Sequence, residues 1–139
     1  MPLGNVVGEV NSKVTSVKVH DLGGGATRIE MDVTGEETGQ AAGQHFGTLC
    51  VTANAPLGSP LPYNYTGVTL TKSGAVVNMS GVGYAIVTAQ GGFKGRYLGT
   101  VRFTTDDPNL AAMNKVVVAT DSVFDPAAMT IKGTASEWN

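Results

Sequence analysis

The chain has 139 residues, which is enough for one domain with a substantial core and too few for two ordinary domains. Hydrophobic residues make up 42% of the chain and charged residues only 14%, well below the roughly 25% of a typical soluble domain. The 9 basic and 11 acidic residues give a net charge of −2 and no dense positive surface, so nucleic acid is not an expected partner. We therefore expect residues 1–139 to form a single domain with a weakly charged surface.

Neither a membrane segment nor a bound metal is predicted. No stretch approaches the roughly 18 apolar residues of a membrane-spanning helix, and the first residues lack the pattern of a secretory signal, so we expect a cytoplasmic protein. The single cysteine, Cys50, excludes an internal disulfide and is interpreted as a small buried hydrophobic residue. His20 and His45 lack the spacing of metal ligands, and no cofactor-binding motif is present, so neither metal nor cofactor is expected.

The chain begins with a predicted β-hairpin. Residues 6–20 alternate apolar and polar side chains toward their end, which is the period of a half-buried strand. The glycine run within residues 21–25 then favours a tight connection. Residues 26–35 form the second predicted strand, whose two faces differ sharply. The face expected in the core carries Ile29, Met31 and Val33, and the face expected in solvent carries Arg28, Glu30 and Asp32.

The middle of the chain contains two more predicted strands and a long loop. Residues 36–44 are polar and contain glycine, so they form either a loop or the irregular start of the strand at 45–53. Residues 54–62 contain three prolines and no regular pattern, which predicts an exposed loop that could act as a lid or rim of an opening. The fourth strand is expected at 63–72 and ends at Ser73-Gly74.

Residues 76–105 are rich in β-branched and aromatic side chains and predict the central hairpin of the fold. Its tight turn is expected at Gln90-Gly91-Gly92. Four further glycines, Gly81, Gly83, Gly95 and Gly99, fall inside its strands. Interior glycines weaken a flat sheet but permit sharp bends, so their recurrence favours a closed barrel.

The last part of the chain contains the one predicted helix. Residues 106–114 contain a capping residue, Asp107, followed by Pro108 and helix-forming residues, which predicts a short helix near 107–114 that could plug one end. Strands are expected at 115–124 and 128–138. The total is eight strands, so the predicted fold is all-β, a single eight-stranded antiparallel barrel able to hold side chains or one small ligand.

A group of aromatic side chains provides the candidate ligand-binding residues. Tyrosines combine an apolar ring with a hydroxyl group, which suits a pocket for a small molecule. The competing interpretation is that they pack in the core or at subunit contacts. The candidate ligand-binding residues are Tyr63, Tyr65, Met79, Tyr84, Tyr97 and Phe103.

Catalytic residues are less well defined. His45 follows Glu36 and Glu37 closely, and an imidazole near a carboxylate can act as an acid/base pair at a barrel mouth. The simpler interpretation of His45 is a solvated residue at the start of a strand. No nucleophile elbow, phosphate-binding loop or catalytic triad is present, so the catalytic candidates are His45 and Glu37, with Glu36 as the alternative carboxylate.

Residues 67–138 resemble a family of small, uncharacterised prokaryotic proteins. The motifs that carry the resemblance are Gly81-Val82-Gly83, Gly91-Gly92, Phe93 to Phe103, Leu110 to Asn114, Val116 to Val118 and Glu137-Trp138. The segment Gly95-Arg96-Tyr97-Leu98-Gly99 is more distantly similar to the allene oxide cyclase-like barrels, which include dirigent proteins. The resemblance implies an allene oxide cyclase-like or calycin-like barrel, often oligomeric, whose lumen in some relatives holds an apolar molecule and guides its cyclisation by shape. It assigns no catalytic residue to this chain.

Three functions are compatible with these observations. The first is a barrel that binds a small apolar or amphipathic molecule in its lumen, including isomerase or cyclase activity that acts by shape. The second is a non-enzymatic barrel with a filled core that assembles into a homo-oligomer through its weakly charged surface. The third is a small hydrolase or hydratase that uses His45 with Glu36 or Glu37. A lumen filled with side chains would argue against the first.

Overall fold

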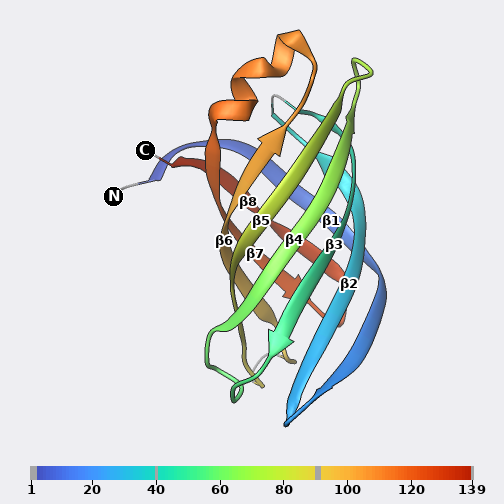
Figure 1. The fold of residues 1–139 in the computed structure, drawn as a ribbon, viewed down its shortest axis with the longest axis vertical. Helices are drawn as coiled ribbons and strands as arrows, with labels where there is room; N and C mark the ends of the chain where they lie inside the picture. Colours follow the sequence, from blue (N-terminus) through green and yellow to red (C-terminus); the bar gives the residue numbers. More distant parts are fainter. Residues whose placement is uncertain (1–2, 40, 90–91, 139) are drawn as a thin grey trace.

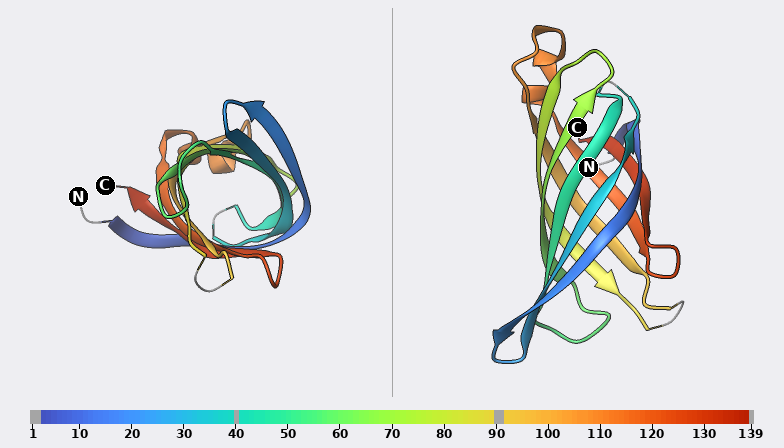
Figure 2. Two further views of the ribbon diagram at one scale, coloured as in Figure 1. Left: turned by 90° about the horizontal axis from the view of Figure 1, so that it is seen from below. Right: turned by 90° about the vertical axis from the view of Figure 1, so that its right-hand side faces the viewer.

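The computed structural model describes residues 3–39, 41–89 and 92–138 and shows one closed antiparallel barrel (Figure 1). Each strand pairs with its sequence neighbours, and the first strand pairs with the last to complete the ring seen end-on in Figure 2. The eight strands are β1 (Leu3–Gly23), β2 (Ala26–Glu37), β3 (Gly43–Ala53), β4 (Leu61–Thr71), β5 (Val76–Val87), β6 (Gly95–Thr104), β7 (Val117–Asp125) and β8 (Thr130–Trp138). The predicted eight-stranded antiparallel barrel is confirmed.

A single short helix, η1 (Pro108–Lys115), joins β6 to β7. The helix predicted near 107–114 is therefore present, in the tighter 3₁₀ form that short helical segments commonly adopt. The Asp107 carboxylate caps it by accepting a hydrogen bond from the Asn109 backbone N–H at 2.7 Å. The helix stands at the same end of the barrel as the β2–β3 and β4–β5 connections, and we call this the helix end (Figure 1). No helix in the described parts of the chain is long and apolar enough to cross a membrane.

The opposite end carries the β1–β2, β3–β4, β5–β6 and β7–β8 connections. Gly24 and Gly25 form the first of these with φ of 62° and 82°, a left-handed conformation that glycine adopts without strain. The β1–β2 hairpin extends past the rest of the barrel (Figure 1), so Val19 is 68% exposed. Gln90 and Gly91, where we predict the central turn, lie outside the described residues.

Inward-facing side chains of the strands fill part of the barrel in two clusters. The predicted faces of β2 are correct, because Met31 and Val33 are buried while Asp32 lies outside and accepts hydrogen bonds from Ser16 and Thr48. The main core cluster consists of Val14, Met31, Val33, Leu49, Val51, Leu61, Tyr63, Ala85, Tyr97 and Ile131. A smaller cluster at the helix end consists of Ala41, Val77 and Met113, packed against Phe103 and Leu110. The space between the two clusters contains the candidate site.

Candidate functional site

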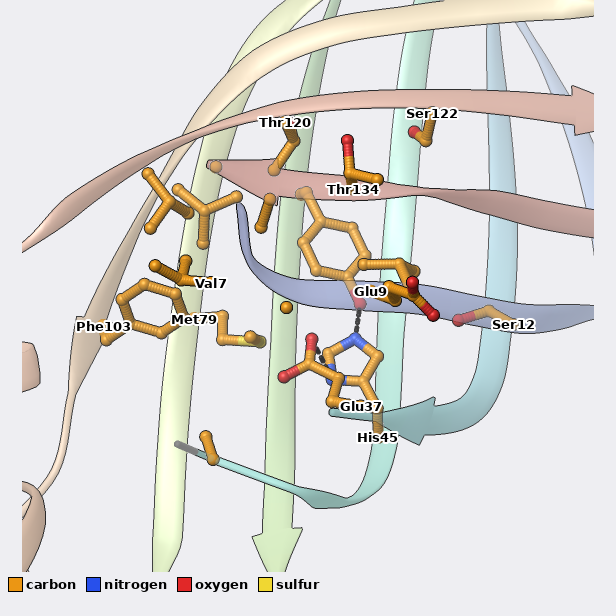
Figure 3. A pocket seen from close by; sticks show the side chains of 18 of the residues that line it. Val7, Glu9, Ser12, Glu37, His45, Met79, Phe103, Thr120, Ser122 and Thr134 are labelled. Carbon is orange, nitrogen blue, oxygen red and sulfur yellow. Dashed lines mark hydrogen bonds and ion pairs between the residues drawn. The ribbon is translucent and has the colours of Figure 1, made fainter. Parts of the chain in front are cut away.

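A cavity of about 200 Å³ lies inside the barrel between the main core cluster and the helix end. Its walls are mainly apolar and come from the inward faces of the strands and from η1. The apolar lining residues include Val33, Leu49, Met79, Val101, Phe103, Met113, Val118 and Ile131. Figure 3 shows Met79 and Phe103 on one part of the wall and the polar groups Glu37 and His45 beside them. The lumen is therefore filled over part of its length and hollow over the rest.

Five of the six predicted ligand-binding residues line this cavity, namely Tyr63, Tyr65, Met79, Tyr97 and Phe103. Tyr84 does not, because it lies on the outer face of β5 and is 58% exposed. Alternation along β5 points Met79 inward and therefore points Tyr84, five residues later, outward.

The loop that we predicted as a rim also lies away from the cavity. Residues 54–60 connect β3 to β4 at the end opposite η1, and none of them lines the cavity. The cavity is bounded instead by the helix end, where Thr38, Ala41, Met113 and Val116 contribute to its wall. The proline pattern predicted a loop correctly, but it contains no information about which end of a barrel is hollow.

Paired glycines make room for the two tyrosines that cross the cavity wall. Gly47 lies opposite Gly67 in the β3–β4 register, and the Tyr65 ring covers this pair so closely that a methyl group on Gly47 would overlap it. Gly83 and Gly99 are paired in the same way between β5 and β6, beneath the ring of Tyr63.

This arrangement extends what we predicted for the interior glycines. They permit close approach of neighbouring strands, and they also leave flat surfaces on which aromatic rings lie.

A buried polar cluster on β2, β3 and β4 lies beside the cavity. The His45 Nδ1 lies 3.0 Å from the Thr69 hydroxyl oxygen, and the His45 Nε2 is hydrogen-bonded to the Tyr65 hydroxyl. The Thr69 hydroxyl donates to the Glu37 carboxylate at 3.2 Å, and the other Glu37 oxygen lies 3.6 Å from His45 Nδ1. Four residues from three neighbouring strands thus form one connected network beside the cavity.

Burial shifts the two ionisable members of this cluster in opposite directions. Burial raises the pKa of Glu37 from 4.5 to about 7, although the hydrogen bond from Thr69 acts against this shift. Burial lowers the pKa of His45 from 6.5 to about 4. Burial, together with the charge of Glu37, also raises the pKa of the Tyr65 hydroxyl. Near neutral pH the imidazole is therefore uncharged, and the carboxyl group exchanges readily between its protonated and ionised forms, as acid/base chemistry requires.

The interpretation of His45 as a solvated residue is wrong. β3 begins at Gly43, so His45 is already an inward position of the barrel, and it is only 2% exposed. Its carboxylate neighbour is Glu37, because Glu36 points to the outside and is exposed. Thr69 was missed because nothing distinguishes it from other strand threonines until the β3–β4 register places it opposite His45.

The remaining chemically notable residues lie away from this cluster. Cys50 is not the buried residue that we predicted, because it alternates with Leu49 and Val51 and faces outward, with its thiol 3.8 Å from the Glu30 carboxylate. His20 also approaches Glu30, at 3.6 Å. Within residues 3–39, 41–89 and 92–138, no group of three or more His, Cys, Asp or Glu side chains is arranged to hold a metal ion.

Comparisons with known proteins identify the fold. No family model matches the chain. No curated protein matches its sequence. A crystal structure of a protein of unknown function from Clostridium acetobutylicum is 12% identical with a TM-score of 0.80, and the match covers 97% of this chain and 98% of that one.

Two further crystal structures have a similar fold. A conserved protein of unknown function from Rhodopseudomonas palustris is 16% identical with a TM-score of 0.79, covering 95% of this chain and 94% of that one. A β-barrel-like protein from Acinetobacter baumannii is 14% identical with a TM-score of 0.75, covering 97% and 94%. The chain therefore has the fold of prokaryotic β-barrel proteins of unknown function, and the similarity to allene oxide cyclase-like barrels stays a prediction.

Proposed function

We propose that this barrel binds a small apolar or amphipathic molecule in its internal cavity. The observation that carries the proposal is the cavity of about 200 Å³ with mainly apolar walls. An apolar protein cavity of about 150 Å³ accepts benzene, so this one suits a molecule somewhat larger than a single aromatic ring. The buried polar cluster at one wall provides the few fixed polar contacts that usually orient a ligand in such a pocket.

The same cluster supports an isomerase or cyclase form of this function. Glu37 and His45 meet in a site sheltered from water, and a carboxyl group that titrates near neutral pH can remove and return a proton. The distant resemblance to allene oxide cyclase-like barrels supports the same reaction class by analogy. A shape-guided reaction needs a ligand held against these groups, so binding is the first property to test.

Cumene, a benzene ring with one isopropyl group, is a suitable probe for binding. We expect the wild-type protein to bind it in a calorimetric titration, and Ala135→Phe to abolish binding because the added ring would occupy the cavity that Ala135 lines. Lys132→Phe adds the same ring to an exposed position of β8 and is the matched control, with binding retained. Absence of cumene binding to the wild type, or equal binding to Ala135→Phe, would contradict the proposal.

A specific surface feature favours a second function, self-assembly. Pro62, Tyr84 and Leu98 are cross-strand neighbours on the outer face of β4, β5 and β6, and Val82 lies beside them with 60% exposure. A contiguous apolar patch of this kind is typical of an interaction site. An ion pair between Arg96 and Asp121 borders the patch at 2.8 Å. A twofold contact brings the same patch of two copies together, and an apolar patch is complementary to its own copy.

We expect the wild-type protein to be a dimer by sedimentation equilibrium and Tyr84→Lys to be a monomer. A lysine there would place a charge in the centre of the contact, which is unfavourable without a partner. Val19→Lys is the control, because Val19 is also exposed (68%, against 58% for Tyr84) but lies on the projecting hairpin away from the patch. A wild-type monomer at high protein concentration would rule out this second function.

A further inference from the structure

Glu37, Thr69, His45 and Tyr65 form an unbroken chain of hydrogen-bonding groups that starts and ends at the cavity. Glu37 and Tyr65 both line the cavity, whereas Thr69 is fully buried behind them. Each of the four groups in this series, a carboxyl, a hydroxyl, an imidazole and a phenol, can both donate and accept a hydrogen bond. Such a chain can carry a proton from one end to the other.

The charge of Glu37 determines which group of each hydrogen-bonded pair is the donor. When Glu37 is ionised, the Thr69 hydroxyl donates to the carboxylate at 3.2 Å. Thr69 has one hydrogen, so at its 3.0 Å contact with His45 it must accept from Nδ1–H. A neutral imidazole with its proton on Nδ1 accepts at Nε2, so the Tyr65 hydroxyl donates to His45. In this state Tyr65 can offer the cavity only an acceptor.

Protonation of Glu37 allows the reverse arrangement. The carboxylic acid then donates to Thr69, Thr69 donates to His45 Nδ1, and His45 Nε2–H donates to the Tyr65 oxygen. The hydrogen of Tyr65 is released from His45 and can point into the cavity. The two states differ by one proton, and passage between them balances. To reach the protonated state, Tyr65 takes up one proton from the cavity and gives its own to His45 Nε2, His45 gives its Nδ1 proton to Thr69, and Thr69 gives its proton to Glu37; the reverse sequence returns one proton to the cavity.

We propose that Glu37, Thr69, His45 and Tyr65 are a proton relay that presents the Tyr65 hydroxyl as a donor to a bound neutral molecule carrying an acceptor oxygen, such as a ketone. This inference rests on the proposed ligand site and specifies the chemical class of its ligand. Glu37 is the group that gains or loses the proton, Thr69 and His45 are positioning residues that pass it on, and Tyr65 touches the ligand.

The charges around the cavity support a neutral ligand. None of the described residues that line it is lysine or arginine, while Glu9 and Glu137 line it together with Glu37. An anionic ligand would therefore meet carboxylates without a compensating cation, which is costly in an apolar site. The ionisable groups nearest to Glu37 are His45 and Tyr65, on the strands that follow it, and burial keeps both uncharged near neutral pH.

Nitrogen-15 NMR of the imidazole tests the relay without any ligand. The chain contains only two histidines, His20 and His45, so the signals can be assigned with a His20→Gln variant. We expect the His45 proton to move from Nδ1 to Nε2 as the pH is lowered through the Glu37 pKa of about 7, with the ring uncharged throughout. Thr69→Val should abolish this exchange and Thr69→Ser should preserve it. An unchanged wild-type tautomer across this range would overturn the relay.

Three probes of one shape test the ligand class: cumene, acetophenone and 1-phenylethylamine. We expect the affinity for acetophenone relative to cumene to be about fivefold greater one pH unit below the Glu37 pKa than one unit above it, as one added hydrogen bond implies. Tyr65→Phe and Thr69→Val should each abolish this pH dependence, and Tyr84→Phe should leave it unchanged.

The outcomes separate this inference from the function on which it rests. If no probe binds but the His45 tautomer still switches, the proposed ligand function fails and the relay stands. If cumene and acetophenone bind with a ratio that does not depend on pH, the ligand function stands and the selection of a ketone by the relay is overturned. Tighter binding of the cationic 1-phenylethylamine than of acetophenone would overturn the ligand class.

Discussion

Gly83→Ala is expected to destabilise the folded barrel by about 3 kcal/mol, the upper end of the cost of overpacking a core. A methyl group on Gly83 would overlap the backbone carbonyl oxygen of Leu98 and would lie 2.6 Å from the Cα of Gly99. Both contacts are with backbone atoms of the paired strand, so rotation of a side chain cannot relieve them. The free energy of unfolding measured by urea denaturation provides the test.

Gly81→Ala is the matched control for this experiment. Gly81 lies two residues earlier on the same face of β5, and a methyl group there would be 3.1 Å from its two nearest neighbours, the Thr100 carbonyl oxygen and the Val101 side chain. A displacement of a few tenths of an ångström is sufficient, so a loss below about 1 kcal/mol is expected. Equal losses in the two variants would show that close strand approach at Gly83 is not the source of the effect.

Glu37→Gln is expected to make the protein sensitive to acid where the wild type is not. The pKa of His45 is about 4 in the folded protein, compared with 6.5 in the unfolded chain. Between these values the unfolded chain binds a proton that the folded protein does not, so lowering the pH destabilises the fold. The pKa of Glu37 is about 7 in the folded protein, compared with 4.5 in the unfolded chain. Between these values the folded protein binds a proton that the unfolded chain does not, so lowering the pH stabilises the fold. Between pH 4.5 and 6.5 the two effects cancel in the wild type.

Single substitutions should show the effect of Glu37 and the effect of His45 separately. Between pH 6.5 and 4.5, Glu37→Gln should lose about 2 kcal/mol relative to the wild type, and His45→Gln should gain a similar amount. Urea denaturation at several pH values in this range measures both, and Glu36→Gln is the control because Glu36 is exposed. If Glu37→Gln and the wild type show the same pH profile, the opposed shifts do not exist.

The sequence predicted the strands well because each strand has its own local signal. The alternation of Met31 and Val33 with charged neighbours on β2 identifies the buried face without knowledge of the partner strand. The site required information of another kind. His45 and Thr69 become neighbours only through the β3–β4 register, and no local pattern fixes the register of two strands separated by a long loop.

The placement of Tyr84 illustrates a similar limit. Tyr84 and Tyr97 are the same residue type and both lie in the central hairpin, but Tyr84 faces solvent and Tyr97 is buried. Residue type identified aromatic candidates, whereas the parity of each position along its strand decided which of them reach the cavity. That parity was available from the sequence for Met79 and Tyr84, which lie on opposite faces of β5.

The pairing of β1 with β8 has a consequence for how the protein is made. This seam joins residues such as Val10 and Gly133, which come from opposite ends of the sequence. During synthesis the ring cannot close until β8 leaves the ribosome, so β1 and the most recently completed strand both expose unpaired edges until then. Long-range strand pairing of this kind also folds slowly. Newly made chains are therefore most exposed to aggregation in the interval just before the last strand is added.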